Sequence, residues 1–120
     1  MLNLDTHILI AGLTADLTDR ELGLLEDENV AISDIVLWEV SMLVDRGRVS
    51  VDMDSAAFRR LLRQLTVFPI TIEIARQSTR LDFRSDPADE IIAATSIVEN
   101  IPLLTRDRKI LRSKIVPFAN

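Results

Sequence analysis

The sequence predicts an α/β fold in which a central parallel sheet is flanked by helices. Short apolar runs typical of buried strands recur along the chain, and longer segments with apolar residues at spacings of three and four lie between them. Strands that alternate with helices are joined by crossover connections, so the strands are expected to be parallel. The 120 residues contain no repeat or linker and are expected to form a single domain, 1–120.

The elements are assigned from these patterns. The candidate strands are Leu2–Leu4, Val30–Ser33, Val67–Ile70, Leu103–Thr105 and Ile115–Phe118. Pro69 lies inside the third run, which suggests an edge strand or an irregularity because proline cannot donate to a ladder. The candidate helices are Leu17–Glu26, Asp34–Arg46, Ser55–Leu65, Ile72–Leu81 and Pro87–Glu99.

Composition excludes several classes of protein. The net charge of −5 disfavours non-specific coating of DNA, although action on RNA is compatible with acids gathered in one pocket and arginines beside it. The absence of cysteine excludes disulfides and cysteine-ligated zinc and suits a cytoplasmic protein. No apolar run is long enough for a membrane span, and the first residues lack the basic region of a secretion signal.

Two aspartates directly follow short apolar runs. Asp5 comes after Leu2–Leu4, and Asp107 comes shortly after Leu103–Thr105. In an open parallel sheet, sites lie beyond the carboxyl ends of the strands, which is where both carboxylates would be. Capping of the next turn is the alternative explanation for each, and for Asp107 taken alone it is the better one.

A carboxylate also falls on an apolar helix face. Glu39 has Ile35 and Val36 one turn before it, and Met42 and Leu43 one turn after it. The spacing therefore predicts that Glu39 is buried, which is costly unless an arginine or a metal ion pairs with it.

The segment Asp86-Pro87-Ala88-Asp89 begins a predicted helix. Capping accounts for Asp86, because Pro87 suits the first helical turn. Capping accounts less well for Asp89, whose neighbours Ile92 and Ala93 place it on the inward face. If these acids converge, they repel one another or take up protons unless a hard cation such as Mg²⁺ or Mn²⁺ lies between them.

These residues resemble a known family. The blocks Leu4-Asp5-Thr6-His7, Ile32-Ser33 with Leu37-Trp38-Glu39-Val40, Asp86-Pro87-Ala88-Asp89 with Ile91-Ile92-Ala93-Ala94, and Leu104-Thr105-Arg106-Asp107 occur in the order found in PIN-domain toxins of the VapC type. The resemblance runs from about residue 2 to residue 116. It implies a PIN-like fold and Mg²⁺- or Mn²⁺-dependent endonucleolytic cleavage of RNA, with a cognate antitoxin and a homodimer as partners.

The resemblance also implies site residues. The family's acids correspond to Asp5, Glu39, Asp89 and Asp107, and supporting roles would fall to Asp86, Ser33 and Thr105. Asp5 and Asp89 would bind the ion directly, while Glu39 and Asp107 would complete the site or hold its waters. The chain departs from the family where relatives often carry a histidine before the Asp-Pro-x-Asp block and an arginine after it, because Arg84-Ser85 and Glu90 stand there instead.

Several residues near these motifs have two readings. Arg106, Arg108 and Lys109 flank the last acid and could hold RNA phosphates, but a solvated surface is slightly favoured. His7 is expected to be structural rather than catalytic, and Trp38 is expected to lie in the core or an interface rather than to stack on a base.

Two other functions are compatible with parts of the pattern. One is a PIN fold that has lost catalysis and only binds a partner, which the retention of all four acids disfavours. The other is a phosphate-accepting receiver domain, which is disfavoured because the paired acids and the late lysine of such domains are not in place.

Overall fold

The computed structural model describes residues 1–120 and contains one parallel sheet. Its strands are β1 (Leu2–Leu4), β2 (Val30–Ser33), β3 (Thr66–Phe68) and β4 (Leu103–Leu104). They lie in the order β3-β2-β1-β4, and every neighbouring pair is parallel. The predicted α/β fold with a central parallel sheet is therefore confirmed.

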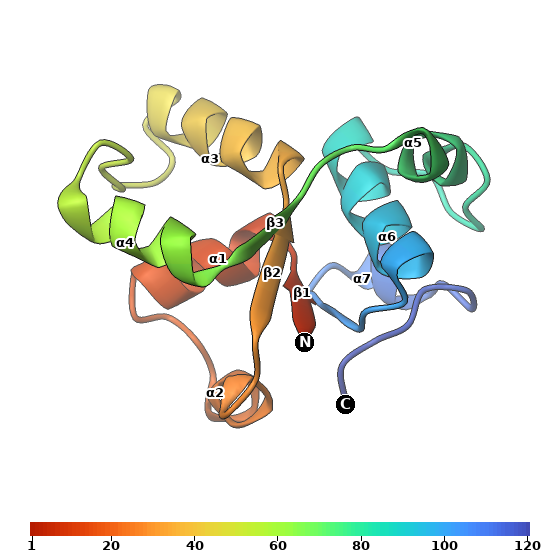
Figure 1. Cartoon of the computed structure of the whole chain (residues 1–120), viewed down its shortest axis with the longest axis horizontal. Helices are drawn as coiled ribbons and strands as arrows, with labels where there is room; N and C mark the ends of the chain where they lie inside the picture. Colours follow the sequence, from red (N-terminus) through yellow and green to blue (C-terminus); the bar gives the residue numbers. More distant parts are fainter.

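Helices cover both sides of this sheet (Figure 1). They are α1 (Thr6–Leu13), α2 (Asp19–Leu25), α3 (Ile35–Asp45), α4 (Ala56–Gln64), α5 (Ile72–Ser78), α6 (Pro87–Glu99) and α7 (Arg108–Leu111). The five helices predicted from periodicity are all present, most of them a few residues shorter than predicted. Thr18 begins α2 with a reciprocal capping box to Glu21, and Ser55 begins α4 by accepting from the Phe58 N–H.

One long helix was missed from the sequence. Helix α1 reads Thr-His-Ile-Leu-Ile-Ala-Gly-Leu, and five of its eight residues are buried. Because almost every side chain in it is apolar, no polar face creates the periodicity by which helices are recognised. Its start was nevertheless marked by Asp5, whose carboxylate accepts a hydrogen bond from the Thr6 N–H.

Two strand predictions needed correction. Ile115–Phe118 forms only a single bridge, between Leu103 and Phe118, because Pro117 has no N–H for a ladder and contributes only its carbonyl to the Leu103 N–H. The third strand ends at Phe68 rather than Ile70, since Pro69 follows directly. That strand lies at the edge of the sheet, as the proline suggested.

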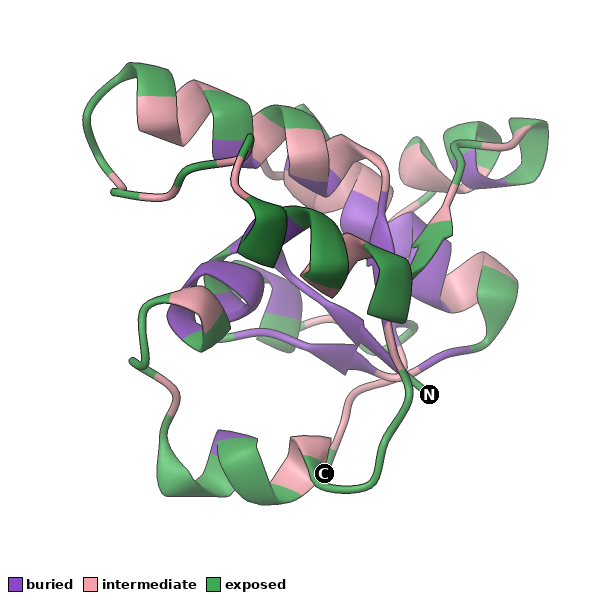
Figure 2. Ribbon diagram, turned by 60° about the vertical axis from the view of Figure 1, so that its left-hand side comes forward, coloured by how far each residue is buried: buried purple, intermediate pink, exposed green.

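The core lies between the sheet and the helices packed on it, which Figure 2 shows as buried strands inside partly exposed helices. Asn3, a fully buried residue of β1, donates from its side-chain amide to the Ile92 carbonyl at 3.2 Å and to the Ser96 hydroxyl at 2.9 Å. These bonds fix α6 against the central strand, which sets the position of Asp89 relative to Asp5. None of the helices combines the length and apolarity needed to span a lipid bilayer.

Candidate active site

The first predicted acid is held firmly at the carboxyl end of β1. Asp5 is 2 % exposed, and its two carboxylate oxygens accept from the Thr6 N–H at 2.8 Å and from the Thr105 hydroxyl at 2.6 Å. Burial raises the pKa of Asp5 above its ordinary value, against the effect of these hydrogen bonds, and the charge of Asp107 raises it further. The carboxylate is thus oriented, but at an electrostatic cost.

Asp107 is coupled to Asp5 through Thr105. The Asp107 N–H donates to the Thr105 hydroxyl oxygen at 3.0 Å, and that same hydroxyl donates to Asp5. The Asp107 carboxylate accepts from the Lys109 N–H at 2.8 Å and caps α7, so the capping interpretation made from the sequence is confirmed. Capping by one oxygen leaves the other oxygen of Asp107 open to a further ligand.

Glu39 projects from α3 toward the end of β1. Its carboxylate accepts a hydrogen bond from the hydroxyl of Thr6, the residue after Asp5. It is half-buried rather than enclosed in the core, because it lies at the edge of the apolar stripe that Val36 and Val40 form. No arginine forms an ion pair with it, so the arginine partner considered from the sequence is not present.

Asp89 lies in the first turn of α6, and its pKa is influenced by the other three acids. Its carboxylate accepts from the Ser85 hydroxyl at 2.8 Å. Desolvation, together with the negative charges of Asp5, Glu39 and Asp107, raises the pKa of Asp89 from 3.8 to about 6 despite that hydrogen bond. The charges of the other three acids named from the sequence therefore act on Asp89.

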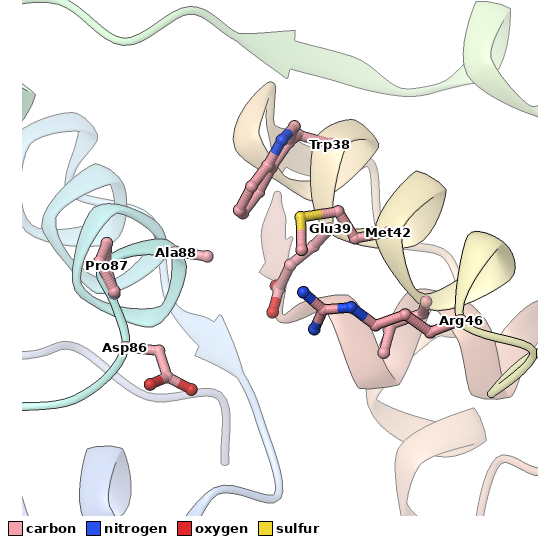
Figure 3. Close-up of a pocket in the computed structure, with 8 residues that line it drawn as sticks. Trp38, Glu39, Met42, Arg46, Asp86, Pro87 and Ala88 are labelled. Carbon is pink, nitrogen blue, oxygen red and sulfur yellow. The ribbon is translucent and has the colours of Figure 1, made fainter.

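Asp86 differs from these acids. It occupies the position before α6, yet its carboxylate makes no capping hydrogen bond, which corrects the prediction that capping explains it. It is exposed and lines a pocket of about 310 Å³ between α3 and the start of α6 (Figure 3). Its carboxylate is turned away from the helix and is free to meet a ligand there.

Some of the predicted supporting and basic residues contact the acids or another carboxylate, and others do not. The Thr105 hydroxyl donates to Asp5, whereas the Ser33 oxygen accepts from the Ile35 N–H at 3.4 Å at the start of α3 and bonds to none of the acids. Arg106 is not free for RNA, because its guanidinium donates to both Glu21 carboxylate oxygens, at 2.7 and 2.6 Å. Arg108 and Lys109 are exposed and make no ion pair, which fits the solvated surface that was favoured.

The two single-copy aromatic residues near the site are both accessible. His7 is exposed and lines a second pocket, of about 300 Å³, with Asp5, Arg106 and Asp107. Trp38 is 54 % exposed, so of the two places predicted for it, the core is wrong and an interface stays a prediction. The helical spacing that places Val36 and Val40 inward turns Trp38, between them, outward.

Sequence reasoning overlooked three residues of the site. Thr6 and Ser85 supply the hydroxyls that bind Glu39 and Asp89, and Arg46 lines the pocket beside Glu39. The first two had a usable signal, because each hydroxyl lies within four positions of an acid in the sequence. Arg46 had only its helical spacing of seven residues, two turns, from Glu39.

The donor set is suited to a hard divalent cation. No three histidine, aspartate or glutamate side chains are already arranged around a common point for an ion. Instead, Asp5, Glu39 and Asp89 each accept from a hydroxyl, and each keeps lone pairs for a further partner. Oxygen ligands with an excess of negative charge are the donor set that Mg²⁺ or Mn²⁺ with retained waters prefers.

Comparison with known proteins agrees with this architecture. A toxin–antitoxin complex from Klebsiella pneumoniae is similar with a TM-score of 0.72 and 25 % identity, covering 93 % of this chain and 91 % of that one. VapBC2 from Rickettsia felis, bound to a DNA fragment from its promoter, is similar with a TM-score of 0.71 and 21 % identity, over 98 % of this chain and 97 % of that one. FitAcB from Neisseria gonorrhoeae has a TM-score of 0.71 and 18 % identity, over 100 % and 97 % of the two chains.

The structures from Rickettsia felis and Neisseria gonorrhoeae are less than 25 % identical to this chain, so they establish the fold alone. No curated protein sequence matches the chain. The model of the PIN domain family matches residues 3–115, which confirms the resemblance inferred from the motifs and argues against a receiver domain. Because that match covers almost the whole sequence, this chain belongs to the PIN-domain family.

Proposed function

We propose that this protein is a Mg²⁺- or Mn²⁺-dependent endoribonuclease and the toxin of a toxin–antitoxin pair. The observation that carries the proposal is the placement of four acids near the carboxyl ends of β1 and β4. Thr105 bonds both Asp5 and the Asp107 N–H, and Thr6, the residue after Asp5, bonds Glu39. The charges of these three acids act on Asp89. A carboxylate cluster with a shared excess of negative charge is a stable arrangement only when protons or a cation offset that charge. Membership of the PIN-domain family supports the same conclusion.

The proposed roles follow the position of each acid. Asp5 and Asp89 bind the ion directly, and Glu39 and Asp107 complete its shell or hold its waters. When bound, the divalent ion supplies a water of lowered pKa and offsets the charge that builds on the phosphate oxygens. Thr105, Thr6 and Ser85 each donate a hydroxyl hydrogen bond to one of these carboxylates, Asp5, Glu39 and Asp89 respectively, and so help to orient it.

The proposed partners are a small antitoxin and a second copy of the chain. The similar solved structure from Klebsiella pneumoniae is described as a toxin–antitoxin complex, which supports the first partner. An apolar pocket of about 300 Å³ supports the first partner, because nine of its ten lining residues are hydrophobic and it opens between α1, α2 and α4. We expect the protein to be located in the cytoplasm, where its RNA substrate is found.

The proposal is tested by removing one ligand at a time. We expect Asp5→Asn and Asp89→Asn to lower RNA cleavage by at least about 100-fold, because each loses one negative oxygen facing the ion. Both variants keep the shape of the side chain, so their circular dichroism should match that of the parent. Cleavage is measured on total RNA in magnesium buffered by a chelator, and chelator alone should abolish the activity of the parent.

Asp54→Asn is the matched control, because it makes the same change in charge at an exposed position outside the pockets described. It should cleave like the parent. Parent-like cleavage by both Asp5→Asn and Asp89→Asn at fixed free magnesium would contradict the assignment. Calorimetric titration with Mg²⁺ separates an active site from a PIN fold that only binds a partner, since the latter should take up no ion at these residues.

A further inference from the structure

The pocket between α3 and α6 has features that ion binding does not require. Trp38 and Met42 project from α3, Arg46 follows at its C-terminal cap, and Asp86 with Pro87 faces them from the start of α6. Figure 3 shows the Trp38 indole and the Arg46 guanidinium on either side of the Glu39 carboxylate, across the gap from Asp86. The pocket therefore places an aromatic surface and a cation next to a proposed metal-binding acid.

The exposure of Trp38 is unusual for its type. Tryptophan is a large apolar residue that is strongly buried on average, and here 54 % of it is accessible beside the acid cluster. Its neighbours Val36 and Val40 are fully buried, so the register of α3 directs the indole outward rather than leaving it out by poor packing. An exposed indole at the mouth of a polar site is a surface on which a planar ligand can stack.

Arg46 differs from the other arginine near the acids. Arg106 is bound by Glu21, whereas Arg46 makes no ion pair although Glu39 and Asp86 line the same pocket. Arg46 is exposed, and its guanidinium is the one cationic group among the residues that line this pocket. A free guanidinium with planar donors is well suited to a phosphate.

A second pocket beside the acids has different chemistry. The pocket lined by Asp5, His7, Arg106 and Asp107 contains no hydrophobic residue, and its one aromatic side chain is the His7 imidazole. The α3–α6 pocket offers an indole and a thioether instead. The indole is the larger flat apolar surface, so we assign the base to the α3–α6 pocket.

From this arrangement we propose that the α3–α6 pocket is a nucleobase subsite, in which a base next to the scissile phosphate stacks on Trp38 while Arg46 holds an adjacent phosphate. The proposal rests on the function proposed above and adds a binding subsite to it. A base can reach an indole only when it is unpaired and turned out of the stack, so the tests below use single-stranded oligomers.

The direct test uses the intrinsic fluorescence of the protein. The chain has one tryptophan and no tyrosine, so its emission reports Trp38 alone. In the full-length Asp5→Asn variant with Mg²⁺ present, we expect oligoadenylate to quench this emission in a saturable way. An abasic ribose–phosphate oligomer of the same length should bind more weakly and leave the emission largely unchanged, because it has no base to stack. Quenching by both oligomers alike, or by neither, would overturn the proposal.

Substitution separates stacking from packing. We expect Trp38→Leu to lower kcat/KM on single-stranded RNA roughly 5- to 150-fold, which is the range that one stacked base represents. Trp38→Phe should retain most activity because it keeps an aromatic face. Ile72→Ala, at a side chain that is 67 % exposed on α5, is the control and should be unchanged. Equal losses for the leucine and phenylalanine variants would overturn stacking.

A protein interface is the competing use of the same indole. Light scattering decides between them, since an interface residue would change the mass of the assembly when Trp38 is replaced by leucine. A lower mass together with the absence of RNA quenching would assign Trp38 to protein contact and overturn the subsite. Failure of the proposed function is recognised separately, because in that case the parent itself would cleave no RNA.

Arg46→Gln completes the test. We expect it to weaken binding of oligoadenylate and of the abasic oligomer by the same factor, because it removes a contact to phosphate and not to a base. Its effect should shrink as salt is raised, while that of Trp38→Leu should not. An Arg46→Gln variant that binds both oligomers as well as the parent does would remove Arg46 from the proposed subsite.

Discussion

The acids fall into two groups that differ in how many hydrogen bonds hold them. The strand side comprises Asp5 and Asp107, which follow β1 and β4, and the helix side comprises Glu39, Asp89 and Asp86, on α3 and at the start of α6. On the strand side, the Asp107 N–H donates to Thr105, whose hydroxyl donates to the buried Asp5, at 3.0 and 2.6 Å. On the helix side, the half-buried Glu39 and Asp89 each accept from one hydroxyl, and Asp86 accepts from none. Adjacent carboxylates of one site therefore differ in how freely they can rotate.

This difference suggests that Asp5 and Asp89 have different roles in binding an ion. Asp5 is fixed by the sheet and by two hydrogen bonds, so it provides the reference point of the proposed metal site. Asp89 is positioned by its helix, which Asn3 anchors to β1, but its carboxylate can move when an ion or substrate arrives. Preorganisation on one side and adjustment on the other would let the site close around a ligand without disturbing the core.

The largest effect that distinguishes the two sides is expected from their hydroxyls. Thr105→Val removes a donor to Asp5 and an acceptor for the Asp107 N–H, so we expect RNA cleavage to fall about 10- to 100-fold. Stability should also fall by about 1–3 kcal/mol, because buried polar groups lose their partners. Cleavage rates and urea unfolding curves measure the two effects.

Ser85→Ala is the counterpart on the helix side. It removes one hydrogen bond to a half-buried carboxylate, so its effect on cleavage should be only a few-fold, near the net value of about 1 kcal/mol for one hydrogen bond. If Ser85→Ala were as damaging as Thr105→Val, the helix side would be as rigid as the strand side and the proposed division would be wrong.

A second prediction concerns the electrostatic cost of Asp89. Its pKa is raised from 3.8 to about 6 in the folded protein, so the folded state holds its proton more tightly than the unfolded state does. The associated stability is present below pH 3.8 and is lost as pH rises through about 6. Asp89→Asn should therefore stabilise the metal-free protein above that pH, by about 1–2 kcal/mol after allowance for partial exposure.

Magnesium should reverse the order of stability of the parent and Asp89→Asn. The ion binds the ionised carboxylate, so it should stabilise the parent and leave Asp89→Asn nearly unaffected. Urea unfolding of the parent and of Asp89→Asn, at pH 5 and pH 7.5 and with and without Mg²⁺, gives the free energies of unfolding to be compared. A metal-free parent whose stability does not change with pH in this range would contradict the raised pKa of Asp89.

The sequence predicted the alternation of strands and helices because their apolar patterns differ, and it predicted the acids because they follow strands or begin helices. It could not predict α1, whose almost uniformly apolar residues hide the helical period. It placed Glu39 too deep, since spacing gives the face of a helix but not how far the neighbouring helix covers it. The pairing of Arg106 with Glu21 joins positions 85 residues apart, and no local pattern encodes such a contact.

The smallest expected effect contrasts the two arginines beside the acids. Arg106→Gln removes the ion pair that fixes α2 to the loop after β4, and we expect a loss of about 1 kcal/mol, because exposure of the guanidinium screens the interaction. The Arg106 guanidinium holds the pKa of Glu21 near 2, below its ordinary value of 4.5, so the pair's contribution is complete above 4.5 and disappears as pH falls toward 2. Parent and variant should thus converge in acid.

Arg108→Gln is the control, since this exposed neighbour makes no ion pair, and its stability should stay within about 0.5 kcal/mol of the parent. Cleavage per folded molecule should be lowered by Arg46→Gln but not by Arg106→Gln, because only Arg46 has a guanidinium free to meet phosphate. If instead Arg106→Gln abolished cleavage while the fold remained stable, Arg106 would have to leave Glu21 when RNA binds. The polar pocket beside His7 would then hold the phosphate that we assign to Arg46.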